Sequence, residues 1–230
     1  MKSPKASFVI PAYNAEAFLA QAILSCRAQS VKEIEIIVVD NGSTDGTEEL
    51  VRWHVSQDKR VRYEICPFQK NRSAARNHGN FLANAPFIFV LDSDDLACKN
   101  RVRDGLIVFQ MKNPDVIYGP FEMIDEHGQH LGNQKAGTFN RETALATRHN
   151  FIGHSTMAYR KGVTMNVQYD EGDYSRLGLD DWHFQWECVL KGYKFGVCST
   201  MQSKYRLYQL PNKTYGSPTE FYRNPEEVKQ

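Results

Sequence analysis

Four short apolar segments, separated by stretches with helical spacing, constrain the fold of this chain more than any other feature of its sequence. The segments cover residues 6–10, 34–39, 61–65 and 87–91. Residues 34–39 are almost continuously β-branched, which is typical of a strand buried on both faces of a parallel sheet. The alternation of strands and helices predicts an α/β fold with a doubly wound, mostly parallel, Rossmann-like sheet flanked by helices. A length of 230 residues favours a single domain.

The segments between these strands carry the helical pattern. Phe18, Ala22 and Cys26 would share one face of a helix over 15–29, with Asn14 as its N-cap. Further helices are expected over 44–54, 72–83, 99–112 and 182–191, and further strands over 116–124, 151–159 and 193–198. The Gly-rich segment 161–178 is expected to be a mobile loop, and residues 209–230 an extended tail.

Composition excludes several classes of protein. The 28 basic and 27 acidic residues leave a net charge of +1, which argues against a nucleic-acid partner. The five cysteines are widely spaced without a Cys-x-x-Cys pair, so we expect free thiols in a reducing compartment. Because no stretch approaches the ~18 apolar residues of a membrane span, we expect a cytoplasmic protein. Contact with a membrane surface is compatible with this composition.

Polar clusters follow three of the predicted strands. They are residues 11–14, 40–46 and 92–95. The carboxyl ends of parallel strands meet at one rim of a sheet, where ligands bind. Asp92 and Asp94 alternate there and can share Mg²⁺ or Mn²⁺, which prefer oxygen ligands. A lone Asp-x-Asp is more often a helix N-cap, but its position after a strand favours a metal.

Other side chains suggest a bound nucleotide. Asp40 can accept a hydrogen bond from the ring N–H of a base such as uracil, and the ring of Tyr13 can stack on that base. Arg72 and Arg76 lie four residues apart on one helix face and suit phosphate, although a solvated face is the alternative. Neither a Walker loop nor a Gly-x-Gly-x-x-Gly fingerprint follows a strand, so a dehydrogenase has no support.

A second acidic pair, Asp180-Asp181, precedes Trp182. One of these carboxylates can act as general base toward a hydroxyl group, or the pair can begin the following helix, and both roles are compatible. His154 and His183 could contact a ligand, but buried structural histidines are more common.

Together these segments resemble glycosyltransferase family 2, whose members have the GT-A fold. The resemblance covers roughly residues 6–198, and it rests on the segments 8–16, 38–47, 74–79, 89–95 and 179–182. The last of these reads Leu-Asp-Asp-Trp where the family usually has Glu-Asp. The Gln-x-x-Arg-Trp motif of processive polymerases is missing, which favours transfer of a single sugar.

The resemblance implies a role for each matched residue. Uridine diphosphate would contact Pro11, Ala12, Tyr13, Asp40, Arg72, Arg76, Asp92 and Ser93. Mn²⁺ or Mg²⁺ would be held by Asp92 and Asp94, and Asp181 would be the catalytic base. His154, Asp180 and Trp182 are weaker candidates for contact with the acceptor or the sugar.

The implied activity is an inverting, metal-dependent transfer from a UDP-sugar to a hydroxyl of a glycan or glycolipid. Residues 1–208 would form the transferase domain, with a nucleotide-binding half over about 1–98 and an acceptor-binding half over about 99–208. A carbohydrate-binding or inactive transferase-like module is the alternative. A phosphohydrolase and a sugar nucleotidyltransferase fit less well, because their motifs belong after the first strand.

Overall fold

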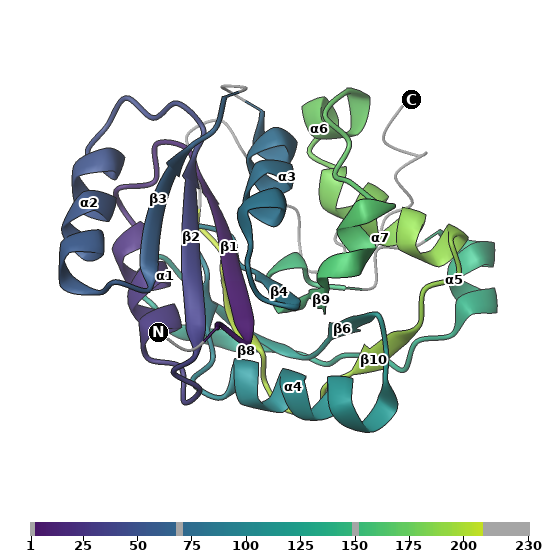
Figure 1. The fold of residues 1–230 in the computed structure, drawn as a ribbon. Coiled ribbons are helices and arrows are strands. Elements are labelled where there is room, and N and C mark those ends of the chain that lie inside the picture. Colours follow the sequence, from purple (N-terminus) through teal and green to yellow (C-terminus); the bar gives the residue numbers. More distant parts are fainter. Residues whose placement is uncertain (1–2, 68–70, 149–151, 209–230) are drawn as a thin grey trace.

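A seven-stranded sheet forms the centre of the computed structural model in Figure 1, which describes residues 3–67, 71–148 and 152–208. Its strand order is β10-β6-β9-β4-β1-β2-β3. The strands are β1 (Ala6–Ala12), β2 (Ile34–Asp40), β3 (Val61–Ile65), β4 (Phe87–Val90), β6 (Val116–Tyr118), β9 (Ala158–Arg160) and β10 (Phe195–Val197). β1 to β4 run parallel, whereas β9 is antiparallel to both neighbours. The predicted mostly parallel α/β sheet is therefore confirmed.

Helices cover both faces of this sheet. They are α1 (Leu19–Arg27), α2 (Thr47–Gln57), α3 (Arg72–Leu82), α4 (Arg101–Lys112), α5 (Arg141–Thr147), α6 (Asp173–Leu177) and α7 (Asp180–Leu190), with 3₁₀ turns η1 (His154–Thr156) and η2 (Lys161–Met165). Alternate residues of β1 point to opposite faces. Phe8 and Ile10 pack with α1, α2 and α4, whereas Val9 packs with α3 and α7. The sheet is thus doubly wound, with one apolar core on each side.

A smaller sheet of four strands lies beside the first, in the order β5-β11-β7-β8. Its strands are β5 (Leu96–Ala97), β7 (Phe121–Ile124), β8 (His130–Gln134) and β11 (Ser203–Arg206). β5 directly follows the acidic loop, residues 92–95, so β11 brings the end of the described chain to that loop.

Several local predictions were wrong. The first helix begins at Leu19 rather than at residue 15, because Asn14 adopts a left-handed φ of 47° and binds the next loop instead of capping a helix. The predicted strand 116–124 is divided between the two sheets. In the described part of the predicted strand 151–159, η1 comes first and β9 begins only at Ala158. The predicted tail lies outside the described residues.

The cysteines and the helix lengths were the subject of two expectations from composition. All five cysteines are free. Within the described ranges, every helix is too short or too polar to span a lipid bilayer.

Candidate functional site

The ends of β1 and β2 lie side by side at the carboxyl rim of the large sheet. Ala12 is the register partner of Asp40, and the Asn41 amide donates to the Ala12 carbonyl at 2.8 Å. Tyr13 follows β1 and is 48% exposed. The structure therefore places an accessible aromatic ring and a strand-end carboxylate at the same rim, as the sequence predicts.

The Asp40 carboxylate is buried and held by three protein donors. Oδ1 accepts from the amides of Gly42 at 3.1 Å and Ser43 at 2.8 Å, and Oδ2 accepts from the Tyr63 hydroxyl at 2.7 Å. A carboxylate offers about four lone-pair positions, so one acceptor position remains for a ligand. Its orientation is fixed before any ligand arrives.

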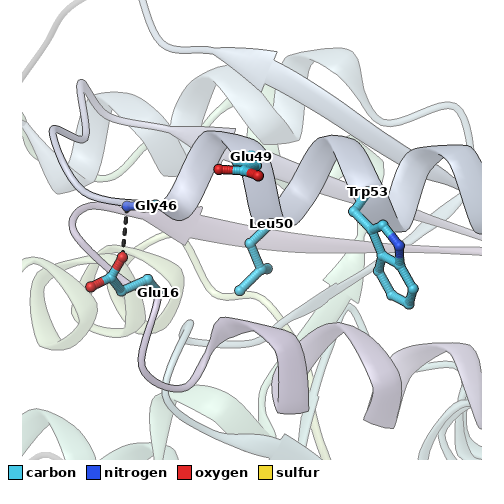
Figure 2. Close-up of a pocket in the computed structure, with 5 residues that line it drawn as sticks. All are labelled: Glu16, Gly46, Glu49, Leu50 and Trp53. Carbon is cyan, nitrogen blue, oxygen red and sulfur yellow. Dashed lines mark hydrogen bonds between the residues drawn. The ribbon is translucent and has the colours of Figure 1, made fainter.

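The loops after β1 and β2 are joined to each other. Asn14 Oδ1 accepts from the Thr44 amide at 2.8 Å, and Glu16 accepts from the Gly46 amide at 2.7 Å. Figure 2 shows the second contact at the edge of an open recess of about 430 Å³. The other lining residues, Glu49, Leu50 and Trp53, come from α2, and none belongs to the predicted site.

The acidic loop begins where β4 ends. Asp92 is held by Arg76 Nη2 at 2.6 Å and lies 3.2 Å from His154 Nδ1. Its amide donates to Ser155 Oγ at 3.0 Å. Burial opposes ionisation of Asp92, but its contacts with His154 and Arg76 outweigh it and hold the pKa of Asp92 well below its usual range.

Asp94 and Asp95 are in a different electrostatic environment. Burial raises the pKa of both carboxyls, and the neighbouring charge of Asp92 raises it further. Asp94 Oδ2 accepts from the Tyr208 hydroxyl at 2.9 Å, and Asp95 Oδ1 accepts from the Arg206 amide at 2.8 Å. Three carboxylates therefore follow one another closely in the acidic loop, and among the described residues only that of Asp92 is held by a guanidinium group.

This loop suits a divalent cation, although no ready-made cluster of three or more His, Cys, Asp or Glu ligands occurs in the described part of the chain. Asp95 Oδ2 is buried without a hydrogen-bond partner among the described residues. Hard oxygen donors suit Mg²⁺ or Mn²⁺. Asp94 is the better ligand, because both Asp92 oxygens already have protein partners.

Arg72 and Arg76 both extend from α3 to Asp180, so they do not form a purely solvated helix face. Arg76 is 3% exposed and Asp180 is fully buried, and they form an ion pair through Arg76 Nη1. Arg72 Nη2 donates to the other Asp180 oxygen at 2.6 Å. Burial opposes ionisation, but the two guanidinium groups hold the pKa of Asp180 below its usual range. Contact of Asp180 with an acceptor would require these pairs to open.

Asp181 is the more accessible carboxylate of its pair. It is partly exposed, and no hydrogen bond of its side chain is found among the described residues. Trp182 is buried instead, and its indole N–H donates to the Arg148 carbonyl at 2.8 Å. Because Asp180 and Trp182 are both enclosed, Asp181 is the residue of this motif with a carboxylate available to a substrate.

His154 lies inside the site. Its Nε2 is 3.0 Å from the Tyr169 hydroxyl, and its Nδ1 faces Asp92. The ring is buried, so it orients Asp92 rather than presenting a free nitrogen to an acceptor. His183 is half-buried on α7, stacked on Tyr174.

Four residues of the site were not foreseen in the sequence: Ser155, Tyr169, Tyr205 and Tyr208. Burial raises the pKa of Tyr205, and the charges of Asp95, Asp92, Asp94 and Asp181 raise it further. Tyr205 lies on β11, which pairs with β5 directly after the acidic loop. These residues follow no motif. The acidic-loop partners of Ser155 and Tyr208 lie 63 and 114 positions away, so no local signal identifies them.

Comparison with solved structures supports this architecture. The chain superposes on the crystal structure of residues 1–349 of S. aureus TarS in complex with UDP-GlcNAc with a TM-score of 0.74 and 20% identity. The match covers 94% of this chain and 63% of that one. At this identity the likeness establishes the fold, which is the predicted GT-A type.

Sequence relatives point to one family. An uncharacterized glycosyltransferase of Haemophilus influenzae is 35% identical over 57% of this chain and 52% of its own length. A Campylobacter jejuni protein named GalNAc(5)-diNAcBac-PP-undecaprenol beta-1,3-glucosyltransferase is 24% identical over 96% of this chain and 70% of its own. The chain thus spans about half the length of the Haemophilus relative. The family model for glycosyl transferase family 2 matches residues 7–167, and the chain belongs to that family.

Proposed function

We propose that this chain catalyses the transfer of a single sugar from a UDP-sugar to a hydroxyl of a glycan or glycolipid, with inversion at the anomeric carbon. The observation that carries the proposal is the convergence of carboxylates from distant parts of the chain. Arg76 donates to Asp92 at 2.6 Å and pairs with Asp180, the neighbour of Asp181, so the acidic loop and the start of α7 lie next to each other.

In the proposed mechanism, Asp181 takes the proton from the acceptor hydroxyl. The acceptor oxygen attacks the anomeric carbon, and the bond between that carbon and the β-phosphate oxygen breaks, releasing UDP. Tyr13 and Asp40 hold the uracil ring at the end of β1 and β2, with Pro11 and Ala12 forming the wall behind it. Asp181 suits the base role because it is accessible while Asp180 is paired.

The acidic loop would hold Mn²⁺ or Mg²⁺, mainly through Asp94, with Asp92 and Ser93 near the ribose and diphosphate. Such an ion, when bound, neutralises charge on the leaving diphosphate. Arg76 and His154 hold the pKa of Asp92 well below its usual range, which favours the charged form of this carboxylate.

Names of similar proteins suggest which donors to test first. TarS has been solved with UDP-GlcNAc, and the Campylobacter relative is named a glucosyltransferase. The latter name also specifies an undecaprenol-linked acceptor. We propose that the protein acts in the cytoplasm, and that it contacts the membrane surface if its acceptor is lipid-linked.

The test is UDP release from UDP-GlcNAc and UDP-glucose in the presence of Mn²⁺. Slow hydrolysis by the wild-type chain is expected, because water can replace the acceptor. Asp181→Asn should lower the rate by about 10²- to 10⁴-fold, the usual contribution of a general base, while UDP affinity changes little. Asp173→Asn, at a carboxylate exposed on α6, is the matched control and should behave as wild type. Sugar binding without UDP release from either donor would favour the binding-module alternative.

A further inference from the structure

Arg76 lies at the meeting point of four structural elements. From α3, its guanidinium pairs with Asp180 at the start of α7 and donates to Asp92 in the acidic loop at 2.6 Å. It also lies 3.4 Å from His154 Nδ1 in η1, and 5.3 Å from the centre of the Tyr169 ring. With 3% of its side chain exposed, Arg76 is enclosed by protein on every side.

Two carboxylates of this cluster already have guanidinium partners without a ligand. Asp180 and Asp92 face Arg72 and Arg76, so two carboxylates meet two guanidinium groups. For Arg76 to bind a phosphate it would have to leave Asp180 or Asp92. That would leave a buried carboxylate without its partner, which is strongly unfavourable. The geometry therefore favours an Arg76 side chain that stays paired with Asp180 and Asp92 when the donor binds.

The segment before Asp180 is tied to the same helix. Asn77 donates to the Tyr169 carbonyl at 2.9 Å and accepts from the Tyr169 amide at 2.9 Å. Asn71, at the N-cap of α3, donates to the Glu171 carbonyl at 2.8 Å and accepts from the Ser175 hydroxyl at 3.1 Å. α3 thus binds the chain from Tyr169 to Asp180 at both ends.

We propose that Arg76 and Asp180 are positioning residues that couple the start of α7 to the acidic loop, so that Asp181 is held at a fixed place relative to the donor. Arg72 supports this coupling through Asp180. The inference rests on the proposed function, and it assigns to Arg72 and Arg76 a task other than binding phosphate. Asp180 accordingly acts through Asp181 and does not touch the acceptor.

The first experiment separates turnover from nucleotide affinity. Asp180→Asn and Arg76→Lys should lower kcat for UDP-GlcNAc or UDP-glucose hydrolysis by about 10- to 100-fold, because a small displacement of a base has an effect of this size. The Kd for UDP with Mn²⁺ should stay within about threefold of wild type. Lysine keeps the charge but cannot bridge two carboxylates as a guanidinium does. A rise of about tenfold or more in the Kd for UDP in Arg76→Lys would overturn the proposal.

A double-mutant cycle tests whether Arg72 acts through Asp180. Arg72 is 44% exposed, so Arg72→Gln should fold even where a change at a buried position does not. If its effect passes through Asp180, adding Arg72→Gln to Asp180→Asn should lower kcat no further. If the double variant instead shows the product of the two single effects on kcat, Arg72 contacts the substrate directly and the inference is contradicted. Arg103→Gln, at an exposed pair on α4, is the matched control.

Hydrogen–deuterium exchange supplies a readout that needs no turnover. Arg72→Gln should increase deuterium uptake in peptides covering 169–183, and leave uptake in β2 unchanged. Unchanged uptake over 169–183 would refute the coupling whether or not the protein is active. Failure of the proposed function has a different signature, namely no UDP release by the wild-type chain from any donor.

Discussion

At the scale of single residues, the pKa values of neighbouring carboxyls in the acidic loop are shifted in opposite directions. The partners of Asp92 outweigh its burial and lower its pKa, whereas burial and the charge of Asp92 raise the pKa of Asp94. The sequence predicts the position of both residues, because they follow an apolar strand. It does not predict their partners, since His154 and Tyr208 lie 62 and 114 positions away.

A glycine on α3 offers a test of packing at this scale. A Cβ at Gly79 would collide with Val9 and lie 3.1 Å from Val39 Cγ2. Alanine is the better helix former by about 1 kcal/mol, but overpacking of a core costs about 1–3 kcal/mol. Because the clashing atoms belong to buried strands, Gly79→Ala should lower the free energy of unfolding by about 1–2 kcal/mol in urea denaturation.

The matched control for that substitution is Gly162→Ala. A Cβ there meets no atom within 4 Å, so we expect a change within about 0.5 kcal/mol. Equal stability of Gly79→Ala and wild type would show that α3 can move away from the sheet at little cost.

At the scale of elements, the segment 161–178 shows how tertiary contacts override composition. Its glycines and polar residues predict a mobile loop, yet the structure forms η2 and α6 there. Asn71 and Asn77 provide hydrogen bonds from α3 that no local pattern reveals. Helices such as α1, α3, α4 and α7 were predictable because their apolar spacing is local, although Asn14 binds Thr44 instead of capping α1.

An ion-pair cluster joins the ends of three elements on the far side of the molecule. Asp58, after α2, accepts from Arg60 Nη2 at 2.8 Å and from Arg27 Nε, at the end of α1, at 3.0 Å. Hydrogen bonds from Arg60, aided by Arg27, outweigh partial burial and hold the Asp58 pKa below its usual range. Asp58→Asn should therefore lower the free energy of unfolding by about 1–2 kcal/mol at pH 7.

The pH dependence of this effect has a definite sign. A carboxyl whose pKa is lowered by folding stabilises the protein fully at pH values above its pKa in the unfolded chain, which is about 3.9 for Asp. That stabilisation is lost as pH falls through the lower folded value. Thermal unfolding should show a constant gap between wild type and Asp58→Asn from about pH 5 to 8, and a narrowing gap below about pH 4. A gap independent of pH would contradict this account. Glu126→Gln, at an exposed carboxylate, serves as the control.

At the scale of the whole molecule, the two halves differ in how far sequence alone predicts them. The parallel run of β1 to β4 follows from local alternation of strands and helices, and so does the position of Asp40 and the acidic loop at one rim. The antiparallel β9 and the second sheet depend on pairings between distant segments, as β11 pairs with β5 and β7. Tyr205 and Tyr208 enter the site through that pairing, and so they could not be predicted.

Ligand linkage tests whether the acidic loop and the ends of β1 and β2 form one binding site. A ligand that binds only the folded chain stabilises it by about 2.7 kcal/mol at 100 times its Kd, which raises Tm by about 5–10 °C in a domain of this size. UDP with Mn²⁺ should therefore raise Tm more than UDP with EDTA. Asp94→Asn should remove the Mn²⁺-dependent part of the shift and keep the rest, because Tyr13 and Asp40 would still bind uracil. Asp173→Asn should keep the full shift. If Asp94→Asn also keeps the full shift, Asp94 does not hold the metal.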